Sequence, residues 1–507
     1  MLMFKNIVTA SFLVMFAGAA PVLATDGVVD IVAPFEITGL DPAKSGDIFL
    51  RMRIVETLVE ADKNGNPLPS LAKSWSVSED GLTWRFELQP GVKFQDGTLL
   101  TAEAVASALT IAKGKAGLLS KAPITEIRAD GDGVVVVSLS KPFVPLLAFL
   151  AENRAQILAP AAYDGAEVKE IIGTGPFKLT KLEAPQSLAV ERFADYWGKK
   201  PEIEKATYLS VSRSETRALM AESGDADYVF NLDPASRTRL ANSDKVVLQS
   251  VSIPRSVLLK VNAGHPFLAD VKAREALSLA IDREGLAVAI LRYPAAATQL
   301  FPPSLKIWHD ADLAPLGYDP EKAKARLAEL GWAPGADGIL QKDGKPFALT
   351  LTTYPDRPEL PLIAAVLQDQ LKEIGVALTI NATNSSEIPA KHQDGSLELA
   401  LMARNFALVP DPIGTMLSDY GPGGGDWGAM NWTNAGFEKA LDDLTRVADP
   451  AEGEALRHQA VAAIQAELPV IPIAWYQQTV AFSPKLQGAS IDPFERTFGL
   501  ETMGWAK

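Results

Sequence analysis

A helix that leads directly into a strand, at residues 361–380, limits the fold of this chain more than any other segment. Residues 361–374 carry apolar side chains near helical spacing, Gly375 can end the helix, and residues 376–380 (VALTI) have the composition of a strand. The apolar positions are Leu362, Val366, Leu367 and Leu371. Further helices are predicted at 271–281 and 319–330, and a buried strand at 134–139 (VVVVSL). Helices alternating with strands indicate the α/β class.

The length and composition favour two globular lobes. The chain has 507 residues, of which 47% are apolar and 22% charged, so it can form two lobes with separate cores. The formal net charge is −14 and there is no long Lys/Arg run, which argues against nucleic acid and anionic membranes as partners. No repeat of 20 to 50 residues is present, which argues against solenoids and propellers.

The N-terminus has the pattern of a secretory signal. A cation at Lys5 precedes an apolar run over residues 7–20, and small or apolar side chains lead to Ala24. The run is shorter than the roughly 20 residues that span hydrocarbon, so we expect residues 1–24 to be a cleaved signal peptide rather than an anchor. The chain has no cysteine, hence no disulfide and no lipid-bearing cysteine. We expect a periplasmic protein without a lipid anchor.

Short motifs spread along the chain occur together in one protein family. They are 39–42 (GLDP), 56–59 (ETLV), 69–75 (PSLAKSW), 80–86 (DGLTWRF), 91–97 (GVKFQDG), 173–177 (GTGPF), 195–198 (DYWG), 274–283 (REALSLAIDR) and 318–323 (YDPEKA). With them the chain resembles family 5 of the bacterial extracellular solute-binding proteins, the peptide, opine and nickel group. The family usually carries His where this chain has Gln95, in a segment that we interpret as structural.

The resemblance implies an α/β, two-lobe periplasmic-binding-protein-like fold of type II, in its large class with an extra subdomain in lobe I. The chain is then expected to cross between the lobes near residues 253–261 and again near 469–475. The expected parts are 25–254 for the first part of lobe I, about 50–165 within it for the extra subdomain, 255–474 for lobe II, and 475–507 for the return to lobe I.

The resemblance also implies a function, that of the substrate-binding component of an ABC importer. A solute that touches both lobes stabilises their closure. The expected partners are permease subunits and their ATPases, and the expected state is a monomer without a cofactor. The motifs H-E-x-x-H, G-x-S-x-G and G-x-x-x-x-G-K-[ST] are absent, so a secreted enzyme on this fold is the weaker alternative.

The ligand is expected to be a small carboxylate-bearing solute, either an opine or a nickel or other metal chelate. In the peptide binders of the family, an acidic residue pairs with the α-amino group of the peptide, and the corresponding place here, near Leu408 or Val409, is apolar. An unpaired ammonium in a closed cleft costs several kcal/mol, which disfavours free-amine peptides. A di- or oligopeptide recognised by its main chain remains the alternative ligand.

Two arginines are candidates for binding the carboxylates. The opine and nickel-chelate relatives hold carboxylates with arginine, whose planar fork donates two parallel hydrogen bonds. Arg154 lies near the position of such an arginine, and Arg404 ends the apolar run 397–403 in the other lobe, followed by Asn405. Each arginine can equally form a structural salt bridge.

The glycine-rich segment 421–428 is the candidate for a loop that covers the ligand. It lacks the Lys-Ser/Thr ending of a phosphate-binding loop, so a plain flexible loop and a cleft-lining loop both remain open. Trp427 is the candidate covering ring, with Asn431 beside it, and Tyr354 follows a predicted strand. Packing in the core is the alternative role of such rings.

The histidines of this sequence give little support for direct metal coordination. The four are His265, His309, His392 and His458, and no two lie at a spacing typical of metal ligands. A transported nickel ion is therefore expected only inside a chelator, and each histidine is interpreted as a surface or polar structural residue.

Overall fold

The structure is a computed structural model, which describes residues 27–45, 47–62, 64–355, 357–406 and 411–506. The predicted signal peptide, residues 1–24, lies outside the described residues. Over the ranges described, none of the helices combines the length and the apolar character that crossing a membrane requires.

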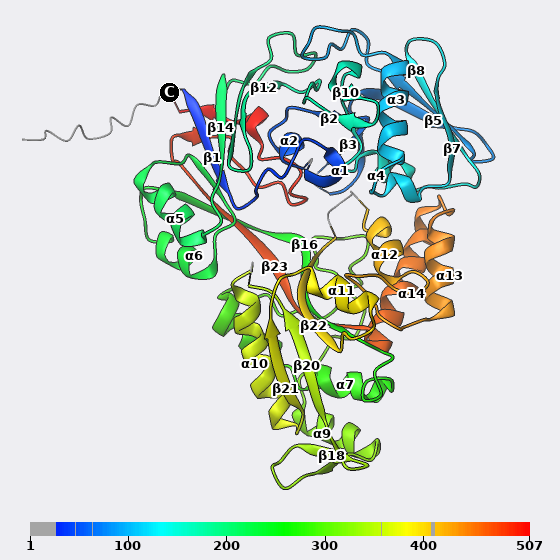
Figure 1. The fold of residues 1–507 in the computed structure, drawn as a ribbon, viewed down its shortest axis with the longest axis vertical. Coiled ribbons are helices and arrows are strands. Elements are labelled where there is room, and N and C mark those ends of the chain that lie inside the picture. The colour runs from blue at the N-terminus through cyan, green and yellow to red at the C-terminus, as the bar shows by residue number, and fades with distance from the viewer. Residues whose placement is uncertain (1–26, 46, 63, 356, 407–410, 507) are drawn as a thin grey trace, which may run out of the picture.

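One ten-stranded sheet runs through the molecule and joins its two halves (Figure 1). In spatial order its strands are β12 (Phe177–Glu183), β13 (Ser187–Arg192), β14 (Lys205–Ser210), β1 (Val28–Ala33), β15 (Tyr228–Phe230), β23 (Val470–Phe482), β16 (Val247–Val261), β22 (Leu399–Asn405), β20 (Ala348–Thr353) and β21 (Ala377–Ala382). The half that contains β1 is called lobe I and the half that contains β20 is called lobe II.

The long strands β16 and β23 pass from one lobe to the other (Figure 1). They are antiparallel, and residues 247–252 of β16 pair with 477–482 of β23 on the side of lobe I. Residues 256–260 pair with 470–475 on the side of lobe II, and the register shifts between Ser252 and Ser256. The two crossings therefore meet at one irregular point of the sheet. The limits of the lobes drawn from the sequence stay a prediction.

The helices pack on the sheets of both lobes. They are α1 (Pro42–Ser45), α2 (Asp47–Arg51), α3 (Ala102–Lys113), α4 (Leu146–Leu150), α5 (Ser214–Ser223), α6 (Pro234–Leu240), α7 (Val271–Leu279), α8 (Arg283–Leu286), α9 (Pro320–Glu329), α10 (Glu359–Glu373), α11 (Glu387–Gln393), α12 (Ile413–Tyr420), α13 (Ala435–Leu444) and α14 (Pro450–Glu467). The predicted helix-to-strand unit is confirmed as α10 and β21. Leu362, however, is 55% exposed, because the buried stripe of α10 runs through Leu360, Ile363 and Leu367.

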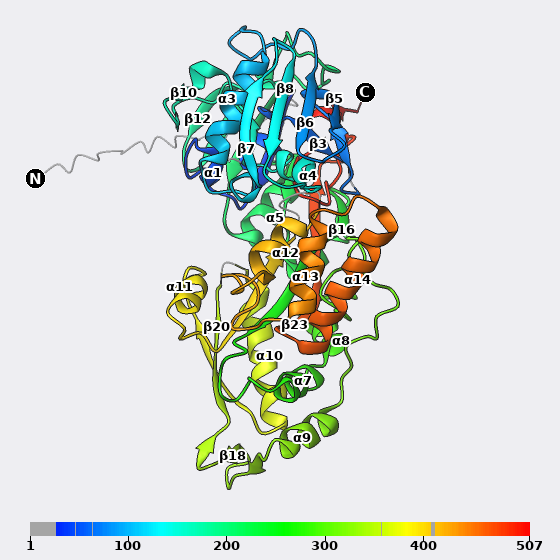
Figure 2. The same ribbon diagram turned by 90° about the vertical axis from the view of Figure 1, so that its right-hand side faces the viewer.

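Lobe I carries a separate four-stranded sheet in the order β5 (Ala72–Val77), β6 (Thr83–Leu88), β8 (Val134–Leu139) and β7 (Ile124–Ala129). Helix α3 lies against β7 and β8 (Figure 2). Short strands complete the fold: β2 (Glu56–Thr57), β9 (Gln156–Ile157), β3 (Val59–Ala61), β4 (Pro67–Pro69), β10 (Tyr163–Asp164), β11 (Glu167–Val168), β17 (Ala333–Pro334), β18 (Leu340–Lys342), β19 (Lys345–Pro346), β24 (Leu486–Gln487) and β25 (Gly504–Trp505).

Buried side chains join several of the sequence motifs inside lobe I. Gln95 Nε2 donates to the carbonyls of Ile54 (2.8 Å), Gly175 (3.2 Å) and Phe177 (2.8 Å), and Gln95 Oε1 accepts from Gly173 N (3.2 Å). A Cβ on Gly173 would lie 2.2 Å from the carbonyl oxygen of Ile54, so only glycine fits there. The glutamine that departs from the family pattern therefore has a structural role.

Glu56 gathers a second set of motif residues. Its carboxylate accepts hydrogen bonds from Thr174 Oγ1 (2.8 Å), Tyr196 Oη (3.0 Å) and Trp197 Nε1 (3.0 Å). Burial raises the pKa of Glu56 despite Arg53 nearby. The motifs 56–59, 173–177 and 195–198 thus form one buried polar cluster rather than a ligand site.

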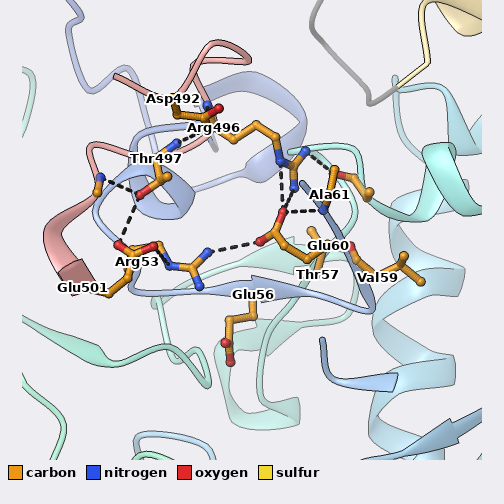
Figure 3. Close-up of polar contacts among 12 residues, drawn as sticks. Arg53, Glu56, Thr57, Val59, Glu60, Ala61, Asp492, Arg496, Thr497 and Glu501 are labelled. Carbon is orange, nitrogen blue, oxygen red and sulfur yellow. Dashed lines mark hydrogen bonds and ion pairs between the residues drawn. The ribbon is translucent and has the colours of Figure 1, made fainter. Parts of the chain in front are cut away.

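The C-terminal segment is tied to the start of lobe I through Glu60 (Figure 3). The Glu60 carboxylate accepts from Arg496 Nη2 and Nε (2.5 and 3.0 Å) and from Arg53 Nη1 (3.1 Å). Arg53 also forms an ion pair with Glu501 (3.4 Å). Residues separated by more than four hundred positions in the sequence therefore share one buried ionic network.

The lobes also meet on the side of α12 and α13, away from the crossing strands (Figure 1). Val144 N donates to Thr445 O (2.7 Å), and Lys121 Nζ donates to Ser418 Oγ (2.8 Å). A Cβ on Gly414 of α12 would lie 2.6 Å from Leu118 Cδ1, so lobe II packs closely against lobe I there. We call these contacts the closure contact.

Candidate ligand-binding cleft

A cavity of about 1060 Å³ lies between the lobes, next to the crossing strands. Lobe I contributes the loop before α5 and the start of α6, and lobe II contributes the ends of β20 and β22 together with Trp427. Strands β16 and β23 contribute Arg255 and Tyr476. This size is at the upper end of the roughly 300–1,000 Å³ of small-molecule sites.

The cavity wall carries six arginines and five carboxylates, a cationic balance in a chain with net charge −14. The arginines are Arg213, Arg217, Arg237, Arg255, Arg357 and Arg404, and the acids are Glu36, Asp47, Glu215, Asp233 and Glu359. Arg217 donates to four backbone carbonyls, and Arg237 donates to Gln477 and to two carbonyls. These two guanidiniums are held by the fold.

Arg255 and Arg404 each have a carboxylate partner within the protein. Arg255 Nη2 lies 2.6 Å from Glu495 Oε2, and both side chains are buried. Arg404 Nε donates to Asp419 Oδ2. A ligand carboxylate at either arginine has to share the guanidinium with its acid.

Arg357 differs, because no carboxylate of the described residues lies within ion-pair distance of it, although Glu359 and Glu495 favour its charge. Its guanidinium lies over the Tyr476 ring, 5.3 Å from the centroid, and Nη1 donates to Tyr476 Oη (3.3 Å). The side chain is half-buried and lines the cavity. The remaining N–H groups are available for a planar acceptor such as a carboxylate.

Sequence analysis missed Arg357, although a signal was present. Arg357 follows β20 by four residues, and side chains beyond the carboxyl ends of parallel strands face the cleft in α/β folds. On lobe I, the exposed Arg213 lines the same cavity. The cavity therefore has cationic groups on both lobes.

Glu359 adds an acceptor near Arg357. Its side chain is buried, and Oε1 has no hydrogen-bond partner in the part of the chain that the structure describes. A buried carboxylate oxygen without a partner is costly, and a ligand amine would satisfy it once the side chains that cover the oxygen move aside. The wall can thus accept both a carboxylate and an amine.

Four of the six predicted site residues line the cavity: Tyr354, Arg404, Asn405 and Trp427. Tyr354 Oη accepts from Ala403 N (3.3 Å), and its ring meets Trp427 edge-to-face at 6.5 Å between centroids. Asn405 Nδ2 donates to Glu495 (3.2 Å). Only Trp427 of the glycine-rich segment contributes to the wall.

The structure does not bring Arg154 and Asn431 to the cavity. Arg154 is exposed and its Nη1 donates to Ala116 O (3.4 Å) within lobe I. Asn431 Nδ2 donates to Asn262 Oδ1 (2.8 Å). Trp432, which follows Asn431, is only 5% exposed and donates to Glu467. Leu408 and Val409 lie outside the described residues.

Metal ligands do not gather in the described ranges: no three His, Cys, Asp or Glu side chains there lie close enough together to hold an ion. Asp411, just before α12, is not available as a metal ligand through Oδ1, because this oxygen accepts from Trp308 Nε1 (3.0 Å) and Ile413 N (2.9 Å). This oxygen is therefore engaged within the fold.

Comparison with known proteins decides the family. The model of bacterial extracellular solute-binding proteins, family 5 (middle), matches residues 66–427. The chain belongs to this family. This family 5 protein is 28% identical to the nickel-binding periplasmic protein of Escherichia coli K12, over 90% of this chain and 92% of that protein. It is also 28% identical to the glutathione-binding protein GsiB of E. coli K12, over 93% of each.

Solved structures share the fold of this family 5 protein. NikA from Brucella suis, in complex with Fe(III)-EDTA, superposes with a TM-score of 0.86 at 23% identity, over 94% of this chain and 99% of that chain. AgaA in complex with agropinic acid, from A. tumefaciens R10, gives 0.79 at 22% identity, over 95% and 99%. The predicted two-lobe α/β fold is confirmed.

Family membership gives the general function. The protein is the solute-binding component of an ABC importer, and proteins of its family are periplasmic or extracellular. The relatives named above are transport proteins rather than enzymes. Their ligands differ, so the cavity of this chain has to supply the argument for its own ligand.

Proposed function

We propose that this protein captures a small amino-acid-derived solute that carries carboxylates, of the opine or metal-chelate kind, in the cavity between its lobes. The observation that supports the proposal is Arg357, a half-buried guanidinium of the cavity wall without a carboxylate partner in the described residues. Glu359 Oε1 beside it would accept the amine of the same solute.

The energetics favour an anionic ligand at this wall. A hydrogen bond to a charged group contributes about 1.5–3 kcal/mol, and a bidentate arginine–carboxylate pair forms two such bonds. Arg404, Asn405, Tyr354 and Trp427 are proposed to complete the contact on lobe II. Arg154 and Asn431 are left out of the proposal, because they lie away from the cavity.

Closure of the lobes follows from the same contacts. Arg213 of lobe I and Arg357 of lobe II line one cavity, so a solute with two carboxylates can contact both lobes. Its affinity for the closed form then exceeds its affinity for the open form, and the difference stabilises closure. Permease subunits and their ATPases are the proposed partners of the closed form.

A di- or oligopeptide is the second candidate ligand. Glu359 offers an acceptor for a peptide amine, and a cavity of about 1060 Å³ accommodates a short peptide. GsiB and the Helicobacter pylori DppA, which is solved with the peptide STSA, are similar proteins. Peptides therefore belong in the same binding screen.

Export and oligomeric state are also proposals. We propose that residues 1–24 are removed as a signal peptide and that the mature protein is a monomer in the periplasm. N-terminal sequencing of the protein from the periplasm should begin at Thr25. Native mass spectrometry of the same preparation should give the mass of a single mature chain.

Thermal-shift screening tests the ligand. Opines, peptides, and nickel with histidine or other chelators are compared in the wild type and in Arg357→Gln. A control, Arg239→Gln, removes an arginine of the same charge from a surface pair with Glu222. At a hundredfold excess over the dissociation constant, a ligand stabilises the folded state by about 2.7 kcal/mol, which the assay detects.

We expect a shift with an opine or a chelate that is lost in Arg357→Gln and kept in the Arg239→Gln control. A shift with peptides alone would move the protein to the peptide-binding branch. An opine or chelate shift that persists in Arg357→Gln would show that the solute is held elsewhere.

A further inference from the structure

Lys260 is the last residue but one of β16 and is completely buried, which is unusual for a lysine. Its Nζ lies 2.7 Å from Gly425 O, 2.9 Å from Asp426 O and 2.8 Å from His392 Nδ1. Two of these three partners belong to the glycine-rich loop directly before Trp427. The ammonium therefore holds the loop segment that places Trp427 in the cavity wall.

The hydrogen-bond geometry fits a charged lysine. An ammonium has three N–H donors, and here three acceptors surround it. His392 then accepts at Nδ1, so its proton is on Nε2 and the ring is neutral. A neutral amine has only two N–H groups and one lone pair, so it keeps all three contacts only if His392 changes tautomer and donates from Nδ1.

The glycine-rich loop packs directly against the backbone of α12. A Cβ on Gly425 would lie 2.3 Å from Ser418 O, and a Cβ on Gly428 would lie 2.2 Å from Asp419 O. Backbone therefore rests on backbone between the loop and α12, and a small displacement of the loop moves Trp427 against Tyr354.

We propose that Lys260 is a positioning residue of the cleft, whose charged ammonium holds Trp427 in the wall of the ligand cavity. The role of that wall in binding rests on the proposed function, whereas the position of Trp427 does not. Lys260 acts through the loop and is not itself among the residues that line the cavity.

Four titratable or charged side chains face Lys260. Asp419 of α12 and Asp426 of the loop favour its charge, whereas Arg404 of β22 opposes it and His392 of α11 is neutral. Burial outweighs the two acids and lowers the pKa of Lys260 to about 7. The lysine is then charged below about pH 7, and above it loses its charge, so that the contact with His392 has to reverse its direction.

The test reads Trp427 directly and needs no ligand. The protein is labelled with fluorotryptophan, and the fluorine resonance of Trp427 is assigned with Trp427→Phe. Spectra are recorded from pH 5.5 to 9 for the wild type, for Lys260→Met and for His392→Ala. Lys391→Met, which removes a lysine next to His392 on α11, is the matched control.

We expect the Trp427 resonance to titrate near pH 7 in the wild type, in the Lys391→Met control and in His392→Ala. In Lys260→Met the step should be absent, with the resonance shifted at every pH. A wild-type resonance that does not change with pH, or a step that survives in Lys260→Met, would overturn the proposal.

His392→Ala separates the lysine from the imidazole, and it decides the question if Lys260→Met fails to fold. Loss of the step in His392→Ala would assign the titration to the imidazole and refute the role of Lys260. Because no solute is present, a failure of the carboxylate-ligand proposal leaves this result unaffected.

Discussion

Replacing Glu60 with glutamine tests the ionic network that fastens the C-terminal segment to lobe I. Glutamine has the shape of a protonated glutamate, so Glu60→Gln removes the negative charge and little else. We expect the variant to lose about 3 kcal/mol of unfolding free energy at pH 6. The loss should become smaller as the pH falls.

The magnitude follows from the surroundings of the carboxylate. Burial disfavours the charge of Glu60, but Arg496 and Arg53 outweigh burial and lower its pKa from 4.5 to about 2. At about 1.4 kcal/mol for each pKa unit, this difference corresponds to about 3 kcal/mol. A depressed pKa stabilises the fold above pH 4.5, and the stabilisation is lost as the pH falls from 4.5 towards 2. About 1 kcal/mol should therefore remain at pH 3.

Urea unfolding of the wild type and of Glu60→Gln at pH 6, 4.5 and 3 measures the effect. Glu87→Gln is the control, because Glu87 pairs with Lys73 at 3.3 Å on the surface and is 56% exposed. Exposed pairs contribute about 0–1 kcal/mol, so the control should differ little from the wild type at every pH.

Two results would refute the reasoning. The first is a Glu60→Gln variant as stable as the control at pH 6, which would show that the buried ion pairs do not outweigh the cost of burying the charge. The second is a difference that stays constant from pH 6 to pH 3, which would trace the loss to packing rather than to charge.

Three further substitutions have expected outcomes. Gln95→Leu should lower the free energy of unfolding by about 2–4 kcal/mol in urea titrations, because it leaves buried carbonyls without donors. Gly173→Ala should be at least as destabilising in the same assay, since its Cβ would meet Ile54 O at 2.2 Å. Gly414→Val, at the closure contact, should enlarge the radius of gyration in X-ray scattering and weaken solute binding severalfold, without changing the ligand cavity. An unchanged radius in Gly414→Val would show that Leu118 gives way instead.

Sequence analysis predicted the elements with local signals best. Helix α9 begins at Pro320 behind the N-cap Asp319, and β8 coincides with the run of four valines, because capping and β-branching act within a few residues. The apolar face of α10 was less well predicted. Leu362 fits the spacing, but the helix starts at Glu359 and turns Leu362 to solvent.

Site residues were harder to predict, because their roles depend on partners distant in sequence. Arg154 and Arg404 looked equivalent in sequence, yet Arg154 turns to a carbonyl of its own lobe and Arg404 lines the cavity beside Asp419. Arg357 is available for a ligand because no described carboxylate pairs with it, which only the fold can reveal. In the sequence Lys260 likewise has no feature that sets it apart from other strand residues. Its role depends on three contacts of Nζ that only the structure shows.

The Glu60–Arg496 contact has a consequence for the order of folding. Its partners are 436 positions apart, with all of lobe II between them. The core of lobe II can therefore fold before the C-terminal segment docks onto lobe I. Lobe I completes its own fold only when that segment is in place. Such long-range pairing makes folding slow, because loop closure over the intervening chain must precede the contact. Removal of the last dozen residues should thus destabilise the region around β3, which lies near the N-terminal end of the sequence.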